Sequence, residues 1–324
     1  MTPAPVYSVV IPVYNEGTHF QYSLSVIRET LATLQEPYEI VVVDDGSTDN
    51  TWALLQDEAQ RLPCLRSARL SRNFGKESAL CAGLDLARGQ AIIVMDGDLQ
   101  HPPHLIPEMV RVWRETGADI VEVVKEQRGK EGIVSKLGAA LFYALFTRLS
   151  GFDLAGATDY KLMDRRVIDA WMEMGEHAPF FRGMISWLGF TRAQVSFAVP
   201  ERAGGTSKWS VIQQIRLALT GVVAFSSLAL HIVTLVGVLF FLLGLLIGGQ
   251  TLFYKLSGQA VDGFTTVILL LLIIGSALML SLGLIGEYIA KIYDEVKGRP
   301  RYVVSKTIEG TDNREPQRVT GEPS

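Results

Sequence analysis

Two pairs of carboxylates follow apolar runs of the sequence, and their spacing suits chemistry with a metal ion. Asp96 and Asp98 follow the run at 91–95 and are separated by one glycine, and Asp44 and Asp45 follow another such run. Two carboxylates this close can share a divalent cation, and Mg²⁺ takes oxygen ligands and usually binds substrate phosphates as well. An isolated Asp-x-Asp is usually a solvated turn. The preceding strand and the second acidic pair favour the metal site here.

The elements around these acidic pairs are expected to alternate between strand and helix. Apolar runs predict buried strands, and polar or proline boundaries mark the helices between them. Such alternation predicts an α/β domain with a mostly parallel sheet covered on both faces. Ligands of such sheets bind beyond the carboxyl ends of the strands, where both acidic pairs stand. The predicted strands are residues 7–13, 39–43, 91–95 and 119–124, and the predicted helices are residues 19–35, 50–61, 75–88 and 103–116.

Hydrophobic residues are concentrated toward the C-terminal end of the chain. The 324 residues are 48% hydrophobic and 20% charged, with a mean hydropathy of +0.23, whereas soluble domains usually contain about 25% charged residues. Positions 217–254 and 263–286 are uncharged runs of 38 and 24 residues. A helix needs about 20 apolar residues to cross a bilayer core. The chain is therefore predicted to carry two transmembrane helices, at about 228–252 and 264–288.

Positive charges flank the two predicted spans on the sides away from the link between them. The link itself holds only Lys255 and Asp262. Because lysine and arginine are retained in the cytoplasm, both termini and the soluble domain are expected there, with the spans in a bacterial inner membrane. The N-terminus shows no features of a signal peptide. The flanking positive residues are Arg202, Lys208 and Arg216 before the first span, and Lys291, Lys297, Arg299 and Arg301 after the second.

The chain is expected to have three parts. Residues 1–208 would form the cytosolic domain, residues 209–295 a juxtamembrane helix and the two spans, and residues 296–324 a cytosolic tail that is partly disordered. The segment at about 132–150 has apolar residues at helical spacing but is too short to span, so it is either a core helix or a helix in the membrane interface. The net charge of −4 gives no sign of a nucleic-acid partner, and two cysteines are too few for a disulfide framework.

Seven motifs occur in a fixed order along the chain. The first four together resemble family 2 glycosyltransferases of the GT-A fold. The last three are similar to the polyprenyl-phosphate members of that family, which include bactoprenol glucosyl transferases and dolichyl-phosphate mannose synthases. The first four motifs are VVIPVYNE (9–16), VVVDDGSTDNT (41–51), LSRNFGKESAL (70–80) and VMDGDLQHPP (94–103). The last three are ATDYKLMDRRVID (157–169), PERAGGTSKWS (200–210) and LIGEYIAKIYDEVKGRPRY (284–302).

The resemblance implies a site with a donor part, an acceptor part and a catalytic part. A divalent cation, Mg²⁺ or Mn²⁺, would be held by Asp96 and Asp98. Asp159 matches the residue that the family offers as a catalytic base, and Gln100 would lie near the sugar or the metal, so the catalytic set is Asp159, Asp98 and Gln100. The nucleotide-sugar would contact Pro12, Tyr14, Glu16, Asp44, Asp45, Lys76 and Asp96. The acceptor phosphate would contact Arg128, Arg202, Ser207 and Lys208.

Physical chemistry qualifies the role of Asp159. The second pKa of a phosphate monoester is about 6, so the attacking oxygen of a lipid phosphate is largely ionised at neutral pH and scarcely needs a base. Asp159 would then orient the acceptor or stabilise the positive charge that develops on the sugar. The basic residues have the clearer task of bringing two anionic substrates together.

The expected activity is the inverting, metal-dependent transfer of a sugar from a nucleotide-sugar to a polyprenyl phosphate, such as undecaprenyl phosphate, on the cytoplasmic face of the membrane. The predicted donor is UDP-glucose, and the predicted transferred sugar is glucose. Mannose from GDP-mannose, an amino-arabinose derivative and a processive polysaccharide synthase are the alternatives. A dehydrogenase would need Gly-x-Gly-x-x-Gly where this chain has VYNEG, and a membrane scaffold has no need of Asp96, Asp98 and Arg202 together. The resemblance also implies a homo-oligomer.

Overall fold

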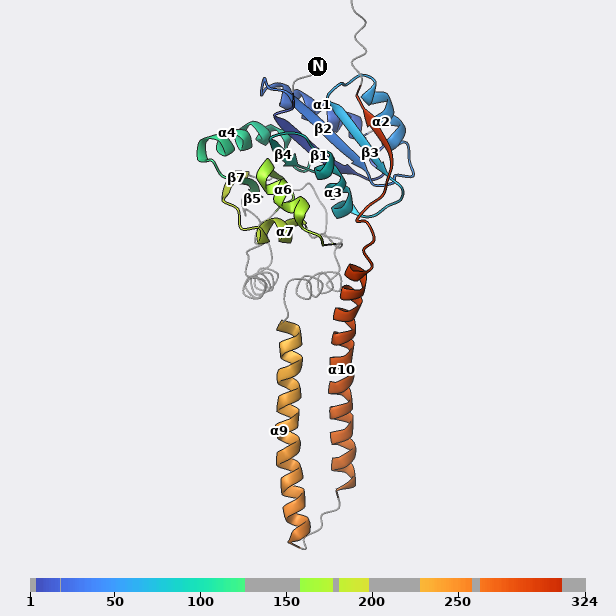
Figure 1. Ribbon diagram of the computed structural model, residues 1–324, viewed down its shortest axis with the longest axis vertical. Coiled ribbons are helices and arrows are strands. Elements are labelled where there is room, and N and C mark those ends of the chain that lie inside the picture. The colour runs from blue at the N-terminus through green and yellow to red at the C-terminus, as the bar shows by residue number, and fades with distance from the viewer. Residues whose placement is uncertain are drawn as a thin grey trace, which may run out of the picture. The chain divides into compact units, whose positions relative to one another are not determined.

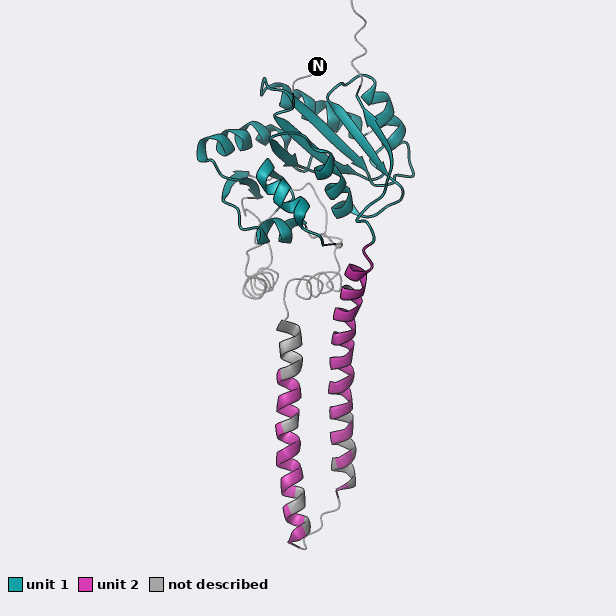
Figure 2. Cartoon of the chain, viewed as in Figure 1, with its two compact units in different colours: residues 1–130, 154–201, 299–324 teal, residues 131–153, 202–298 magenta. Residues whose placement is uncertain are grey.

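The chain divides into two compact units, which are coloured separately in Figure 2. Unit 1 consists of residues 1–130, 154–201 and 299–324, and unit 2 consists of residues 131–153 and 202–298. Unit 1 contains all the strands of the described chain, and unit 2 contains two long helices. This computed structural model describes residues 4–17, 19–125, 158–176, 181–197, 228–257 and 263–310.

Unit 1 is built on one sheet, which the described residues form from eight strands in the order β7-β5-β6-β4-β1-β2-β3-β8 (Figure 1). The strands β4, β1, β2 and β3 are parallel to one another, and β5 is parallel to β7. β6 and β8 pair antiparallel to their neighbours. The predicted α/β architecture with a mostly parallel sheet is thus confirmed. The strands are β1 Tyr7–Val13, β2 Tyr38–Asp44, β3 Leu65–Leu70, β4 Ala91–Val94, β5 Ile120–Lys125, β6 Lys161–Asp164, β7 Arg192–Phe197 and β8 Val304–Glu309.

Helices cover both faces of this sheet because successive residues of a strand point to opposite sides. In β1, Val9 and Ile11 belong to the large core that also contains apolar residues of α1, α2 and α4. Val10 faces α3 instead, and a Cβ atom on Gly83 of α3 would lie only 2.3 Å from its Cγ1. Glycine therefore allows α3 to pack closely on β1. The helices of unit 1 are α1 His19–Ala32, α2 Thr51–Ala59, α3 Lys76–Leu86, the 3₁₀ helix η1 Pro103–Leu105, α4 Ile106–Thr116, α6 Arg165–Glu173 and α7 Phe181–Trp187.

The four predicted strands and four predicted helices are present with bounds that shift by only a few residues. The strands β3, β6, β7 and β8 were not predicted. In β3, Arg66 and Arg69 interrupt the apolar pattern that would have marked a buried strand. The guanidinium of Arg66 lies 3.3 Å from a carboxylate oxygen of Glu39, and that of Arg69 lies 3.3 Å from Asp44. These ion pairs let a charged segment enter the sheet.

The strand β8 joins unit 1 from the far end of the sequence. It pairs antiparallel with β3 and so covers that edge of the sheet. Before the strand, Tyr302 donates a hydrogen bond to Asp85, and Arg301 donates one of 2.7 Å to the carbonyl oxygen of Glu176. Residues 296–324 were predicted to form a cytosolic tail, and the structure shows that part of this segment belongs to the sheet.

Unit 2 contains α9 Leu228–Leu256 and α10 Phe264–Val296, of 29 and 33 residues. Within the described part of the chain, Ile273–Val296 is the helical segment long and apolar enough to cross a membrane, and Leu235–Gln250 is a shorter apolar one. Large apolar side chains along both helices are exposed, as at Leu246 with 67% and Leu280 with 76%. The interfacial helix predicted at about 132–150 and the juxtamembrane residues 209–227 lie outside the described residues.

The packing of β8 makes a prediction about stability. Ile308 is the partly buried apolar residue of β8 that packs against the main core, whereas Thr307 beside it is exposed. Ile308→Ala should lower the free energy of unfolding by about 1–2 kcal/mol, below the cost of truncating a fully buried isoleucine. Thr307→Ala is the matched control and should be close to neutral. Urea denaturation of the full-length protein in detergent, followed by tryptophan fluorescence, measures both, and equal values for the two variants would contradict the packing role of β8.

Candidate active site

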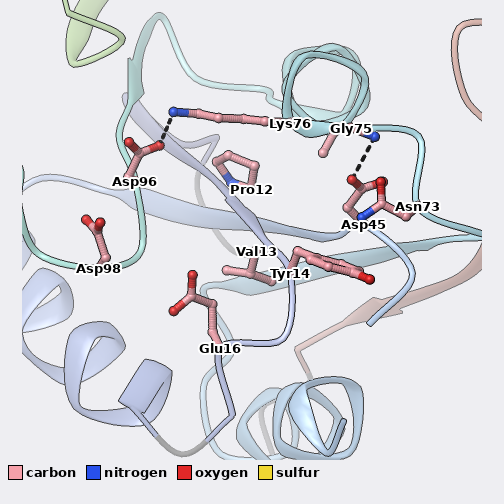
Figure 3. Close-up of a pocket in the computed structure, with 11 residues that line it drawn as sticks. Pro12, Val13, Tyr14, Glu16, Asp45, Asn73, Gly75, Lys76, Asp96 and Asp98 are labelled. Atoms are coloured by element: carbon pink, nitrogen blue, oxygen red, sulfur yellow. Dashed lines mark hydrogen bonds and ion pairs between the residues drawn. The ribbon is translucent and has the colours of Figure 1, made fainter. Parts of the chain in front are cut away.

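A pocket of about 320 Å³ lies where β1, β2 and β4 end and α3 begins (Figure 3). Its position agrees with the rule that ligands of parallel sheets bind beyond the carboxyl ends of the strands. Of the charged residues that line it in the described chain, four are acidic and only Lys76 is basic. The lining residues are Pro12, Val13, Tyr14, Glu16, Asp45, Asn73, Gly75, Lys76, Ala79, Asp96 and Asp98.

The loop after β1 is held against the loop after β2. The backbone N–H of Asn15 donates to the hydroxyl of Ser47 at 2.9 Å, and its side-chain oxygen accepts from the N–H of Thr48 at 2.8 Å. Asn15 has a φ of 54°, a left-handed conformation that asparagine tolerates better than most residues. The N–H of Glu16 donates to the hydroxyl of Thr51. These bonds fix Tyr14 and Glu16 at the wall of the pocket.

Asp45 positions the loop that leads into α3. Its two carboxylate oxygens accept hydrogen bonds from the backbone N–H groups of Phe74, at 2.7 Å, and Gly75, at 2.8 Å. Burial raises the pKa of Asp45, and these two donors partly offset the rise. Lys76 follows Gly75 directly as the first residue of α3. The hydrogen bonds to Asp45 therefore fix the position of the Lys76 backbone. Asp45 therefore shapes the pocket as well as lining it.

The loop after β4 carries Asp96 and Asp98, the pair of carboxylates predicted to bind a divalent cation. The N–H of Gln100 donates to Asp98 at 3.0 Å and closes a tight turn. Leu99 within this turn has a φ of 57°, an uncommon conformation that costs of order 1 kcal/mol. Gly97 separates the two acids because a Cβ atom there would lie 3.1 Å from the ring of Phe20. Asp98 points to the pocket, and Asp96 meets the ammonium group of Lys76 at 2.5 Å.

Asp159 is brought beside this loop by an unpredicted strand. β6 runs antiparallel to β4 with Lys161 opposite Val94, so the residues just before β6 lie next to the residues just after β4. The Nζ atom of Lys76 is 2.8 Å from Oδ2 of Asp159 and thus bridges it to Asp96. One ammonium group therefore joins α3, the end of β4 and the start of β6.

Arg182 at the start of α7 makes a bidentate ion pair with Asp159. Its Nε lies 2.6 Å from Oδ1, and its Nη2 lies 2.9 Å from Oδ2. Burial alone would raise the pKa of Asp159, but the hydrogen bonds and charge of Arg182 and the charge of Lys76 hold that pKa well below its usual range. The hydrogen bonds to Asp159 in turn raise the pKa of Arg182. Asp159 is therefore a buried carboxylate that stays ionised and has cations on both of its oxygens.

The donor set of the pocket suits a hard divalent cation. Burial raises the pKa of Glu16, and the nearby carboxylates of Asp98 and Asp96 raise it further, which shows how closely negative charge is gathered here. Two carboxylates leave most positions around Mg²⁺ or Mn²⁺ for water and substrate phosphate, the usual arrangement for Mg²⁺. Within the described residues no cluster of three or more His, Cys, Asp and Glu side chains forms a metal cage. The residues fit a cation that is shared with a ligand.

The structure places the predicted site residues in four ways. Seven of them line one pocket, namely Pro12, Tyr14, Glu16, Asp45, Lys76, Asp96 and Asp98. Asp159 contacts the pocket residue Lys76. Asp44 is fully buried with Oδ1 on the N–H of Ser47 and does not line the pocket, and Gln100 is exposed on the turn after Asp98. The acceptor residues Arg128, Arg202, Ser207 and Lys208 lie outside the described residues.

Sequence reasoning missed Arg182, although a signal was present. Residues 178–190 read APFFRGMISWLGF, and Arg182 is the one charged residue among them. A single charge in an apolar segment needs a partner when the segment packs into a domain. The position of that partner, Asp159, depends on β6, which was not predicted. The pocket residues Val13, Asn73, Gly75 and Ala79 were also missed, because they contribute backbone and shape rather than charge.

The fold and the pocket define an α/β enzyme with its substrate site at the ends of parallel strands. Residues 8–168 match the family model described as glycosyl transferase family 2. The chain is 37% identical over 310 residues to the uncharacterized glycosyltransferase YkcC of Bacillus subtilis, covering 95% of both chains. It is 34% identical over 309 residues to the prophage-derived bactoprenol glucosyl transferase of Shigella flexneri, covering 94% of this chain and 98% of that one. A solved structure of glucosyl-3-phosphoglycerate synthase from Mycobacterium tuberculosis is similar with a TM-score of 0.47 and 20% identity, over 68% of this chain and 77% of that one.

The chain belongs to glycosyltransferase family 2, and it is a glycosyltransferase. The resemblance found in the sequence motifs is thereby confirmed, as is the GT-A-like α/β fold. The similarity extends well beyond the family domain, because the aligned relatives cover more than nine-tenths of the chain.

The contact between Arg182 and Asp159 predicts a change in pH dependence. Asp159 has a depressed pKa, so its ionised form persists until the pH falls through that low value. In Arg182→Met the effect of burial is still opposed by Lys76 but no longer by the bidentate guanidinium, so the pKa of Asp159 should rise from its depressed value. The acceptor phosphate becomes protonated below a pH of about 6, and in that range the transfer rate of Arg182→Met should fall more steeply than that of the wild type. The rate at neutral pH should fall by about tenfold or more, since a charged hydrogen bond contributes about 1.5–3 kcal/mol.

The measurement is the transfer rate of the purified enzyme as a function of pH. Arg182→Lys keeps the charge and should show a smaller effect at acidic pH. Arg166→Met is a matched control, because Arg166 pairs with Asp119 and Asp164 at the surface. A fall in rate at acidic pH that is equally steep in Arg182→Met and in the wild type would show that Arg182 does not set the ionisation of Asp159.

Proposed function

We propose that this glycosyltransferase transfers glucose from UDP-glucose to the phosphate of a polyprenyl lipid such as undecaprenyl phosphate, with a divalent cation and with inversion at the sugar carbon. The observation that carries the proposal is the pocket with Asp96 and Asp98 at the end of β4, in a chain 34% identical to a bactoprenol glucosyl transferase over nearly its whole length. Relatives of the same name from the Shigella phages SfII and SfV support the same substrate class.

The donor would lie in the pocket with its diphosphate toward Asp96, Asp98 and Lys76. Mg²⁺ or Mn²⁺ held by the two aspartates would neutralise the charge of the departing diphosphate. The ammonium group of Lys76 would contact the same phosphates, since it is the basic group of the pocket. Tyr14 is 44% exposed at the pocket wall and offers a ring face to the nucleoside, beside Pro12 and Asp45.

The acceptor phosphate would attack the sugar without losing a proton to the protein. The oxygen of a phosphate monoester is largely ionised at neutral pH, because its second pKa is about 6. Asp159 would orient the acceptor or stabilise the positive charge that develops on the sugar rather than act as a base, because its oxygens are already bonded to Arg182 and Lys76. Arg128, Arg202, Ser207 and Lys208 would hold the acceptor phosphate. A single displacement by this oxygen inverts the sugar carbon.

The membrane part of the proposal rests on unit 2. We assign α9 and α10 as two spans, because both helices exceed the length of about 20 residues that a bilayer requires. Exposed apolar side chains along them are costly in water and favourable in lipid. With positive residues on the outer flanks of the helices, both termini and unit 1 would lie in the cytoplasm, at the face where the donor is made available. Residues 1–208 together with β8 would form the cytosolic part, and residues 209–295 the membrane part, of a homo-oligomer.

The central test uses full-length protein in detergent with undecaprenyl phosphate and a panel of nucleotide-sugars. UDP-glucose should give a lipid-linked product with the inverted anomer, EDTA should abolish it, and Mg²⁺ or Mn²⁺ should restore it. Asp96→Asn and Asp98→Asn should each reduce the rate by about 100-fold, a barrier increase of about 2.7 kcal/mol. Asp57→Asn is the control, because Asp57 is exposed on α2 away from the pocket.

Each outcome of this panel has a defined meaning. Product from GDP-mannose or from an amino-arabinose donor instead of UDP-glucose would reassign the sugar within the same class. A retained anomer would exclude the single displacement. The absence of lipid-linked product with every donor would overturn the proposed substrate class.

A second test addresses the two spans with one accessible cysteine at a time in a Cys64→Ser background, in which the remaining Cys81 is buried. Ser257→Cys, in the link after α9, should react with a membrane-impermeant maleimide in intact spheroplasts. Gln60→Cys in unit 1 and Ser305→Cys in β8 are exposed positions, and they should react only after permeabilisation. If Gln60→Cys reacts together with Ser257→Cys before permeabilisation, α9 does not cross the membrane.

A further inference from the structure

In this structure the ammonium group of Lys76 supplies positive charge beside the predicted metal ligand Asp96. The Nζ atom of Lys76 lies 2.5 Å from Oδ1 of Asp96 and 2.8 Å from Oδ2 of Asp159. Figure 3 shows the side chain extended from α3 along the pocket to the end of β4, with its ammonium group directed at Asp96. Lys76 therefore occupies one of the two carboxylates that the proposed divalent cation would use.

An ammonium group on Oδ1 of Asp96 disfavours a divalent cation on the same carboxylate, because the two positive centres would lie only a few ångströms apart. Mg²⁺ ligands lie at about 2.0–2.1 Å, and two positive centres this near to one carboxylate repel each other strongly. The pocket holds no other basic side chain among the described residues that could take the place of Lys76. Lys76 thus competes with the metal for Asp96 as long as no further negative charge is present.

The binding of a nucleoside diphosphate changes this balance. Its phosphates bring negative charge that can pair with the ammonium group and oxygens that can complete the coordination of the metal. The side chain of Lys76 is 41% exposed and that of Asp96 is 30% exposed, so neither is locked in a packed core. Asp159 would keep its bidentate contact with Arg182 if the lysine moved, so no buried carboxylate would be left without a cation.

We propose that Lys76 is an internal counter-cation of Asp96 that yields to the metal only when the donor binds. The metal and the nucleoside diphosphate then enter the pocket together, and the empty enzyme binds divalent cations weakly. When the donor binds, the ammonium group of Lys76 leaves Asp96 and pairs with the diphosphate, and it keeps its ion pair with Asp159. The proposal rests on the proposed function in taking a nucleoside diphosphate as the leaving group of the donor and Asp96 and Asp98 as the ligands of the metal.

The test measures Mn²⁺ binding rather than sugar transfer. Free Mn²⁺ is followed by electron paramagnetic resonance in titrations of the full-length protein in detergent, with no nucleotide, with UDP and with GDP. Without nucleotide, Lys76→Met should bind Mn²⁺ about tenfold more tightly than the wild type, a difference of about 1.4 kcal/mol. The wild type should gain more Mn²⁺ affinity from one of the two nucleotides than Lys76→Met does.

Three further variants make the result specific. Lys76→Arg keeps the positive charge and should bind Mn²⁺ as weakly as the wild type. Lys306→Met removes an exposed lysine on β8, outside the pocket, and should change nothing. Adding Asp96→Asn to Lys76→Met should abolish the gain, because the new affinity arises at Asp96. If Lys76→Met is poorly folded by its thermal transition, Lys76→Gln takes its place.

Two results would overturn the proposal. One is equal or weaker Mn²⁺ affinity in Lys76→Met without nucleotide. The other is an equal gain from nucleotide in the wild type and in Lys76→Met. Both are independent of whether any sugar reaches a polyprenyl phosphate, so a failure here is distinct from a failure of the proposed substrate class.

Discussion

The contacts of one ammonium group hold the pocket together. Lys76 is set in place by Asp45, which binds the N–H of the residue before it, and its Nζ bridges Asp96 and Asp159. The start of α3, the loop after β4 and the residues before β6 thus meet at the ammonium group of Lys76. Since an unpaired carboxylate buried like Asp159 would be costly, Lys76 and Arg182 stabilise Asp159 in its position just before β6 and beside the end of β4. The site is consequently a feature of the tertiary fold as well as of the motifs.

The sequence predicted the part of the site that follows from strand geometry. Parallel strands place their carboxyl ends at one edge of a sheet. The acidic residues after the predicted strands at 39–43 and 91–95 were therefore expected to meet, and Asp45, Asp96 and Asp98 line one pocket. Asp44 is fully buried and bonds the N–H of Ser47, and its contact with the nucleotide-sugar stays a prediction. Which of two adjacent acids faces a ligand depends on the turn that follows the strand, and periodicity does not specify that turn.

The parts that were not predicted are those in which charge replaces the apolar pattern. β3 contains two arginines, and β6 begins with Lys161, which is fully buried and pairs with Glu122 at 2.5 Å. β8 lies in a polar stretch after an apolar helix, so hydropathy gives no reason to return it to the sheet. Each of these strands depends on partners far away in the sequence. Arg182 was not predicted for the same reason, since the position of its partner Asp159 depends on β6.

The charges of the pocket argue for a cation independently of any motif. Among the described residues that line the pocket, Glu16, Asp45, Asp96 and Asp98 are accompanied by one basic side chain, that of Lys76. Burial together with neighbouring carboxylates already raises the pKa of Glu16. A diphosphate entering such a pocket would meet net repulsion at short range, where low polarity strengthens charge interactions. One lysine cannot offset both the acids and the ligand. A divalent cation brought in with the diphosphate would offset most of this negative charge, and it would also free the lysine to act on the phosphates. Affinity for the donor and affinity for the metal are then two aspects of one electrostatic requirement.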